Sequence, residues 1–324
     1  MTKPAQRARK QKRPNPKSAA TKFRETATPR VPYEEIEIRT ADGAWLRAFA
    51  IDPPDGVRLA GTCVLAHAMF ARKTAFGRRD RKGLAHACAA RGFRAIAFDF
   101  RGHGESTPPP DAPEWGYDHL VRFDLPTVVD CARARSEGLP LVVVGHSLGG
   151  HVALAAQGTG AMEADAIVGL GANVWMRAFE PSRLRWAAKV ALTKTLLAIA
   201  GRARRFPARW LRLGSDDATE RYLRDLFRGV TESTWGSADG RDDYLANLVR
   251  VTIPFANVLG TRDRIMCGPA SGEAFTRVVA GPTTTFRADA DHPGLVTKAS
   301  SHPVVLDAIA WAADLALMAQ GGCS

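Results

Sequence analysis

Ser147 lies in a sequence context that could turn its hydroxyl group into a nucleophile. Residues 145–149 read Gly-His-Ser-Leu-Gly, a G-x-S-x-G pattern. The apolar run 141–144 precedes it and the small residues of 148–157 follow it, which predicts a strand, a tight turn and a helix. Glycines are needed in such a turn because a larger side chain would collide with neighbouring backbone. A chance match on a loop is the alternative, and the two flanking runs argue against it.

The elements that would hold this turn can be followed along the chain. After a hairpin with its turn at 41–43, strand-like and helix-like runs alternate: strands at 62–66, 94–98, 141–144, 166–170, 255–259 and 284–287, and helices at 82–90, 118–136, 148–157, 271–279 and 304–319. This alternation predicts an α/β fold with a mostly parallel central sheet flanked by helices. The interruption from 171 to about 250 is too long for a simple connection. Its helix-like stretches at 183–200 and 219–229 indicate a helical lid inserted into a domain spanning 32–324.

The turn around Ser147 resembles the nucleophile elbow of the α/β-hydrolase superfamily, and the resemblance covers nearly all of residues 33–320. Residues 99–106 resemble its D-x-R-G-x-G-x-S loop, whose role is structural. Residues 65–70 resemble its H-G-x segment, with Ala68 where glycine is usual. The resemblance implies that the backbone amides of Met69 and Leu148 form an oxyanion hole. We interpret His67 as a buried histidine that braces the loop, in preference to a catalytic role. Within the superfamily, the chain most resembles the serine-aminopeptidase and monoacylglycerol-lipase-like branch.

The resemblance also implies that the acid and the base follow the serine in the order Asp, then His. Asp263 follows the predicted strand 255–259, in a turn similar to the superfamily's G-x-x-D; a surface ion pair with a flanking arginine is the alternative. No carboxylate follows the rival strand 166–170. Among the eight histidines only His292 and His302 follow Asp263, and His302 stands at the start of the last predicted helix. We therefore predict a triad of Ser147, His292 as base and Asp263 as the acid that orients the base.

The positive charge of the chain is concentrated at its N-terminus. The net charge is +12, and residues 1–30 hold ten Lys and Arg against one Glu, so +9 belongs to that segment and +3 to the rest. We interpret 1–31 as a disordered basic tail; an organelle-targeting sequence, or an arm touching anionic lipid or nucleic acid, is the alternative. The weakly charged remainder gives no reason to expect a specific nucleic-acid partner.

The compartment is predicted from what the sequence lacks. The N-terminus has no apolar segment typical of a secretory signal, and no run of 18 apolar residues is present. The five cysteines are widely spaced and form no metal-binding pattern, which is typical of a reducing compartment. We therefore predict a cytoplasmic protein.

The predicted lid combines cations with apolar side chains. Residues 181–215 hold nine Lys and Arg and no Asp or Glu, interleaved with Leu, Val, Ile, Phe and Trp. Such a segment, or the tail, could rest weakly on an anionic membrane surface. It could also line an acyl pocket, or be an ordinary lid helix with a solvated basic face.

These features together predict a serine hydrolase that cleaves a carboxylic ester, of the esterase or lysophospholipase type, through an acyl-enzyme. Its substrate would be a small-molecule or lipid-like acyl compound, because an aminopeptidase would need carboxylates that the basic lid lacks. A peptidase, amidase or acyltransferase with the same triad is the alternative, and a non-catalytic member of the fold is a third. Ser147 excludes reactions that need an aspartate nucleophile; lyases and cofactor-free oxygenases stay open. The predicted chemistry requires no cofactor and no metal.

Overall fold

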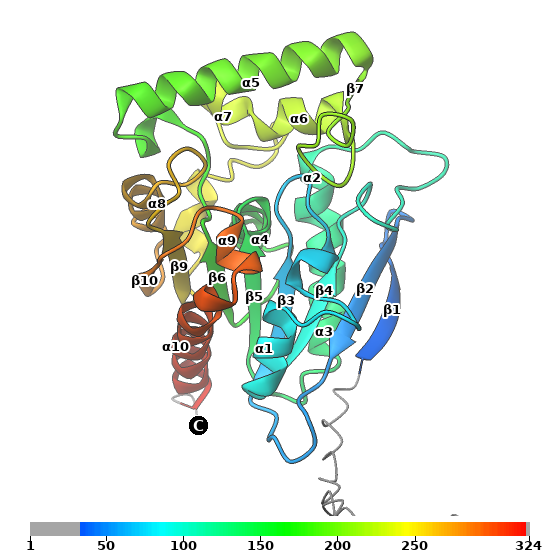
Figure 1. Ribbon diagram of the computed structural model, residues 1–324, viewed down its shortest axis with the longest axis vertical. Coiled ribbons are helices and arrows are strands. Elements are labelled where there is room, and N and C mark those ends of the chain that lie inside the picture. Colours follow the sequence, from blue (N-terminus) through cyan, green and yellow to red (C-terminus); the bar gives the residue numbers. More distant parts are fainter. Residues whose placement is uncertain (1–32, 322–324) are drawn as a thin grey trace, which may run out of the picture. The chain divides into compact units, whose positions relative to one another are not determined.

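An eight-stranded sheet forms the centre of residues 33–321, the part of the chain that this computed structural model describes (Figure 1). In spatial order the strands are β1 (Tyr33–Arg39), β2 (Trp45–Ile51), β4 (Phe93–Phe98), β3 (Gly61–Ala66), β5 (Leu141–His146), β6 (Ala166–Leu170), β9 (Phe255–Gly260) and β10 (Thr283–Ala288). Strand β2 is antiparallel to both neighbours, and all other neighbouring pairs are parallel. The predicted fold class is confirmed. The predicted tail at 1–31 lies outside the described residues.

The central strands are buried along their whole length. Every residue of β3, β5, β6 and β9 is buried, because parallel strands in the middle of such a sheet are covered by helices on both faces. Their carboxyl ends meet at one edge of the sheet. The loops after β3, β5, β9 and β10 carry Met69, Ser147, Asp263 and His292 respectively, so the fold brings all four predicted site segments to that edge.

Helices cover the two faces of the sheet and enclose two separate apolar cores. On one face lie α1 (Leu84–Ala90), α9 (Gly294–Thr297) and α10 (His302–Gly321), together with the 3₁₀ turns η1 (Lys73–Phe76) and η5 (Ala299–Ser301). On the other lie α3 (Leu125–Arg133), α4 (Leu148–Thr159) and α8 (Pro269–Thr276). The short α4 is rich in small residues, which lets it pack closely under the turn at Ser147.

The helix predicted at 118–136 is divided in the structure. It consists of α2 (Tyr117–His119), a π-helical turn η2 (Leu120–Asp124) and α3. Pro126 lies in the first turn of α3. Proline has no backbone N–H to donate, so a regular helix does not pass through this point.

The helical run 299–321, which includes α10, is long and apolar enough to cross a membrane by length and composition, and an 18-residue window within it has a mean hydropathy of 1.4. Its residues Val305, Ile309, Ala312 and Ala316 are nevertheless buried in the apolar core on one face of the sheet. The apolar stripe of this helix therefore has a partner within the fold.

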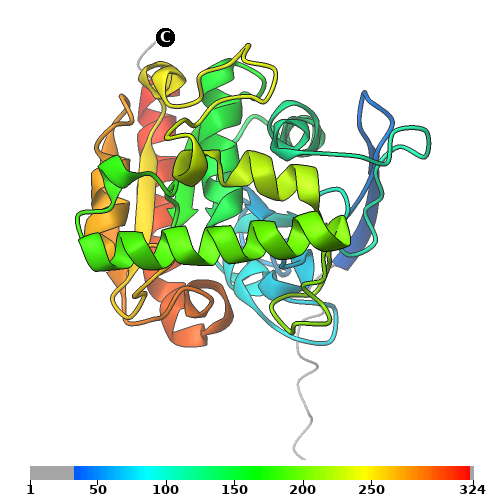
Figure 2. The same ribbon diagram turned by 90° about the horizontal axis from the view of Figure 1, so that it is seen from above.

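A helical insertion, residues 171–254, joins β6 to β9. It holds η3 (Arg177–Phe179), α5 (Arg183–Ala203), the small hairpin of β7 (Arg205–Phe206) and β8 (Ala218–Thr219), α6 (Glu220–Leu226), α7 (Arg228–Thr231) and η4 (Ala246–Arg250). Figures 1 and 2 show α5 running across the end of the fold beside α6 and α7. The helix predicted at 219–229 is broken at Phe227, where the backbone leaves helical geometry.

Candidate active site

Ser147 occupies a strained backbone position between β5 and α4. Its φ of 51° and ψ of −109° lie where residues other than glycine are rarely found. The strain is held by backbone hydrogen bonds on both sides: Ser147 N donates to Leu170 O over 3.0 Å, and Ser147 O accepts from Gly150 N over 3.0 Å. Because strained non-glycine residues persist only where the surroundings fix them, this geometry is typical of a functional turn.

The glycines around Ser147 are required by close packing. A Cβ atom at Gly145 would lie 2.3 Å from the backbone of Gly149, and one at Gly149 would lie 2.3 Å from the carbonyl oxygen of Ala66. Both distances are far inside van der Waals contact. The strand–turn–helix geometry predicted from the motif is thus present, with the tight approach that the glycines imply.

Asp263 and His292 lie in direct contact at the same edge of the sheet. Asp263 Oδ2 accepts a 2.6 Å hydrogen bond from His292 Nδ1, although the two residues are 29 positions apart. The carboxylate also accepts hydrogen bonds from the amides of Met266 (3.0 Å) and Cys267 (2.9 Å). Burial alone would raise the pKa of Asp263, but His292 and these amides hold it below its ordinary value. The carboxylate is therefore fixed in its charged form and in one orientation.

The alternatives for the acid and the base have other partners. Arg262 pairs with Asp289 over 3.0 Å rather than with its neighbour Asp263. His302, the first residue of α10, is hydrogen-bonded through Nε2 to the carbonyl oxygen of Val296 in α9 over 3.0 Å. The structure thus joins the two residues predicted as acid and base and separates His302 from them.

Gly171 connects the histidine to the serine turn. Leu170, which accepts the hydrogen bond from Ser147 N, is followed directly by Gly171. A Cβ atom at Gly171 would lie 3.0 Å from both Nδ1 and Cε1 of His292. His146, the residue before Ser147, is bonded through Nε2 to the carbonyl oxygen of His292 over 3.0 Å. The backbone of the serine turn and the imidazole therefore lie on either side of the end of β6.

The loop after β3 is braced by a buried histidine. His67 Nδ1 donates to Ala68 O over 2.8 Å, and Nε2 accepts from the amide of Phe100 over 3.0 Å. Burial lowers the pKa of His67 to about 4, so it stays neutral. The bracing role predicted for His67 is confirmed. Met69 and Leu148, the predicted oxyanion-hole residues, line one pocket together with Ser147.

That pocket is mainly apolar but contains polar groups that sequence reasoning missed. It encloses about 560 Å³ of empty space, part of it open to solvent. Its apolar walls include Val174, Trp175, Leu226, Phe227 and Met266, most of them from the insertion. Its remaining polar members are Tyr117, His151, Asn173, Asp225 and Trp235. Only His151, one helical turn after Ser147, had a sequence signal, because a histidine interrupts an otherwise small and apolar helix.

Asp225 is the unexpected carboxylate of this pocket. It lies near the end of α6 and accepts a 3.2 Å hydrogen bond from the amide of Tyr117. Burial, and then the negative charge of Asp118, raise the pKa of Asp225 to about 6. Residues 181–215 contain no acidic residue, but the pocket wall contains one, Asp225.

A buried ion pair holds α5 of the insertion against the segment that precedes it. Lys189 of α5 is 0% exposed and donates to Glu180 over 2.9 Å. Its ammonium lies 5.4 Å from the ring centroid of Trp175, whose Nε1 donates to Met266 O over 2.9 Å. One of the nine cations expected on a solvated lid face is thus buried. Because an isolated buried charge is unfavourable, Lys189 and Glu180 depend on each other.

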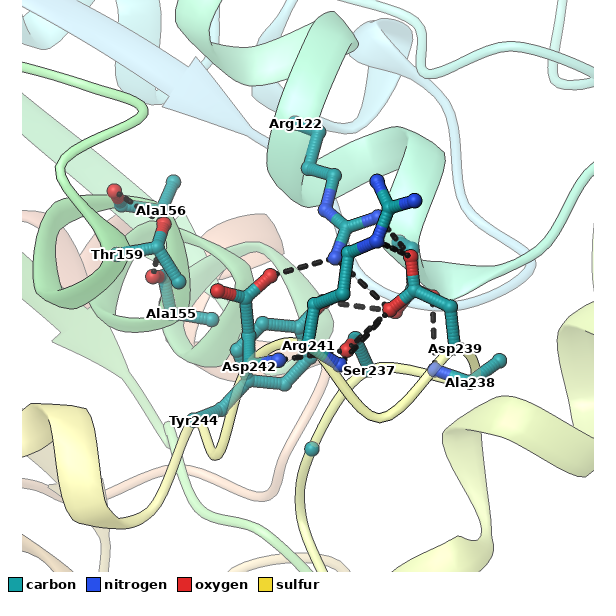
Figure 3. A network of polar contacts seen from close by, with 12 residues as sticks. Arg122, Ala155, Ala156, Thr159, Ser237, Ala238, Asp239, Arg241, Asp242 and Tyr244 are labelled. Atoms are coloured by element: carbon teal, nitrogen blue, oxygen red, sulfur yellow. Dashed lines mark hydrogen bonds and ion pairs between the residues drawn. The ribbon is translucent and has the colours of Figure 1, made fainter.

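A network of ion pairs fixes the segment that carries Trp235. Arg122 of η2 contacts Asp239 over 2.8 Å and Asp242 over 2.6 Å (Figure 3). Asp118 accepts from Tyr244 Oη over 2.7 Å and from the amide of Ala238 over 2.8 Å. These contacts join residues 237–244 to the helix that carries Tyr117, so the pocket wall is held from two sides.

Comparison with known protein families identifies the class. The chain matches the family described as "Serine aminopeptidase, S33" over residues 61–289. This match covers more than half of the chain, which therefore belongs to that family of α/β hydrolases and is an enzyme of hydrolase type. No curated protein matches the chain in sequence.

Solved structures share the fold at low sequence identity. An esterase from Exiguobacterium antarcticum has a TM-score of 0.56 at 17% identity, covering 86% of this chain and 99% of its own. An enol-lactonase from Burkholderia xenovorans has a TM-score of 0.52 at 19% identity, with coverages of 86% and 100%. An N-formylmaleamic acid deformylase from Pseudomonas putida has a TM-score of 0.54 at 15% identity, with coverages of 84% and 100%.

Proposed function

We propose that the protein is a serine hydrolase that cleaves carboxylic esters through an acyl-enzyme. The observation that carries the proposal is the 2.6 Å hydrogen bond between Asp263 and His292 beside the strained turn at Ser147. Because Nδ1 of His292 donates to the carboxylate, Nε2 is the nitrogen left to accept a proton. The Ser147 hydroxyl then loses its proton to Nε2 as its oxygen attacks the ester carbonyl.

The remaining steps follow from the same groups. The negative charge that develops on the carbonyl oxygen is stabilised by the amides of Met69 and Leu148, worth on the order of 3 kcal/mol of barrier each. The imidazolium of His292 is stabilised by Asp263, whose lowered pKa keeps it ionised. The imidazolium gives its proton to the departing alcohol oxygen, leaving Ser147 acylated. Water, deprotonated by His292, then attacks the acyl group, and the imidazolium returns the proton to Ser147 Oγ as the carboxylic acid is released.

An ester is favoured as substrate by the apolar walls of the pocket. Val174, Trp175 and Phe227 offer contact area for an uncharged acyl or aromatic group. The structures that share the fold include an esterase and a lactonase, and both of these act on ester bonds. A small-molecule or lipid-like acyl compound is the substrate class that this wall fits.

Hydrolysis of an amide or peptide bond is the second candidate function, and Asp225 is the observation that favours it. A carboxylate in the pocket wall could hold the ammonium group of a peptide N-terminus. Against this, burial and the charge of Asp118 raise the pKa of Asp225 by more than Arg221 and Arg228 lower it, so the carboxylate is less acidic than an ordinary one. The apolar wall therefore outweighs this one group, and the ester is the leading proposal.

The substrate is proposed to reach the pocket at an anionic lipid surface. Leu184 and Trp210 of the insertion are 82% and 81% exposed, and Leu213 is also exposed. The exposed cations around them are Arg183, Lys194, Arg202, Arg204, Arg205, Arg209 and Arg212. Interfacial segments commonly combine an exposed tryptophan with such cations. The cytoplasmic location predicted from the sequence stays a prediction.

The test is hydrolysis of a series of p-nitrophenyl esters from short to long acyl chains, beside aminoacyl p-nitroanilides. The proposed function predicts turnover of esters that falls by at least about 10⁴-fold in Ser147→Ala, because that change removes the nucleophile. Turnover of the anilides alone would establish the second candidate. Ester turnover that survives in Ser147→Ala would refute the acyl-enzyme mechanism.

A further inference from the structure

His151 is a polar group whose presence in the pocket the proposed reaction does not explain. It lies on α4 four residues after Ser147, and Ser147 O accepts a hydrogen bond from its amide over 3.3 Å. Side chains on a helix lean toward its N-terminus, so the ring of His151 covers the turn that begins at Ser147. It lines the same pocket as Ser147. Any group that occupies this pocket therefore meets the imidazole.

The hydrogen bonds behind His151 determine which of its nitrogens carries the proton. Trp235 Nε1, which can only donate, lies 3.4 Å from Tyr117 Oη. Tyr117 Oη lies 2.8 Å from His151 Nδ1. In the described part of the chain, Nδ1 of His151 is the acceptor within hydrogen-bond distance of Tyr117 Oη, so the phenol proton is donated to Nδ1. The imidazole then carries its proton on Nε2. Burial lowers the pKa of His151 to about 3, so the ring is neutral and presents one donor.

No protein partner is available to this donor within residues 33–321. The hydrogen bonds of His151 in the described part of the chain are those of its backbone and of Nδ1. Leu148, Val174 and Phe227 supply apolar surface nearby in the pocket. Nε2 is accessible from the pocket rather than sealed within the protein, so a water molecule can bond to it when the pocket holds no substrate. A substrate atom can serve as the acceptor.

We propose that Nε2–H of His151 binds an uncharged oxygen acceptor, such as a keto or ether oxygen, on the substrate group that enters this pocket. The inference rests on the proposed ester hydrolysis and narrows its substrate class from plain acyl esters to esters with a second oxygen near the scissile bond. A carboxylate acceptor would be repelled by Asp225 when that residue is ionised, and a neutral imidazole offers no positive charge to offset the repulsion, so an uncharged acceptor is favoured. His151 acts here as a specificity residue, and Tyr117 positions it.

Matched substrates test the inference. Each pair of chromogenic esters differs by replacement of one methylene with an ether oxygen, placed in the acyl chain in one set and in the alcohol in the other. For each pair, kcat/KM of the ether ester is divided by that of the plain ester. This ratio is compared between the wild-type protein and its variants, so the intrinsic reactivity of each ester cancels.

The expected result is a ratio that falls by about 3- to 10-fold in His151→Phe for at least one pair, as expected for one lost hydrogen bond. His151→Gln, which keeps an N–H donor, should restore part of the ratio. Tyr117→Phe should lower it, because the proton is then no longer held on Nε2. Thermal unfolding of each variant identifies any that fail to fold.

Two outcomes separate this inference from the proposed function. If wild-type protein hydrolyses the esters in a Ser147-dependent way but His151→Phe leaves every ratio unchanged, the inference is wrong and ester hydrolysis stands. If wild-type protein hydrolyses none of them, the proposed function itself fails. A purely structural role for His151 would change rates for both members of a pair equally and would also overturn the inference.

Discussion

Gly171 and His292 are in contact so close that no side chain fits between them. A Cβ atom at Gly171 would lie 3.0 Å from two atoms of the imidazole ring, and Gly171 itself has a φ of +64°. Leu170, the residue before Gly171, accepts the hydrogen bond from the amide of Ser147. The adjacent residues Leu170 and Gly171 therefore position both the proposed nucleophile turn and the proposed base.

Gly171→Ala is therefore expected to displace the imidazole by a few tenths of an ångström and to lower kcat by up to about 10-fold, since a displacement of 1 Å can cost about 100-fold. Steady-state kinetics on an ester substrate measures this. Gly160→Ala is the matched control: Gly160 has a φ of +76°, but a Cβ atom there would meet no other atom of residues 33–321 within 4 Å. Equal losses of activity in both variants would show that backbone strain, and not contact with His292, is responsible.

The identity of the base can be tested with two histidine variants. His292→Ala should lower kcat/KM by at least about 10³-fold, because it removes the proton acceptor held by Asp263. His302→Ala should retain most of the activity, since His302 contacts Val296 O instead. If His302→Ala is the inactive variant and His292→Ala is active, the assignment of the base is wrong.

The sequence predicted the parts of the site that depend on local chain geometry. The turn at Ser147 requires its glycines, and Asp263 and His292 each follow a strand, so their meeting at one sheet edge follows from topology. The pocket wall could not be predicted in this way. Asp225 and Trp235 reach it through the packing of the insertion, whose long-range contacts leave no periodic signal in the sequence. Burial of Lys189 was missed because its partner Glu180 lies outside the helix.

Asp225 should make stability depend on pH. Its folded-state pKa of about 6 is above the ordinary value of 3.8, so the folded chain binds the proton more tightly, and stability falls as pH rises from 3.8 to 6. Asp225→Asn removes this penalty. We expect it to raise the free energy of unfolding by about 1–2 kcal/mol at pH 7.5, and by less at pH 5, after discounting for partial exposure. Urea unfolding at both pH values measures the difference; a larger gain at pH 5 would contradict it.

The buried pair of Lys189 and Glu180 should be strongly coupled. Lys189→Met leaves Glu180 buried with one remaining cation among residues 33–321, the partly exposed Arg185, so we expect a loss of about 3 kcal/mol in the free energy of unfolding. The double variant with Glu180→Met should lose less than the sum of the single variants. Arg224→Met, which breaks the exposed pair with Glu220, is the control and should change stability by less than about 1 kcal/mol. Additive losses would show that the two buried charges are independent.

The exposed apolar side chains of the insertion should contribute to lipid binding. Trp210→Ser with Leu213→Ser keeps every cation of the insertion, and we expect it to reduce co-sedimentation with phosphatidylglycerol vesicles. Met318→Ser is the control, because Met318 is 71% exposed but lies on α10. Binding that the first variant leaves unchanged, or that a soluble polyanion reproduces equally, would indicate charge attraction without insertion into lipid.

About half of the pocket wall comes from a different part of the chain than the proposed reacting groups. Ser147, Asp263 and His292 lie on loops of the sheet, whereas Trp175, Phe227 and Trp235 belong to residues 171–254. Exchange of that one continuous segment would therefore change which substrates fit the pocket, while the loops that carry the proposed triad stay unchanged.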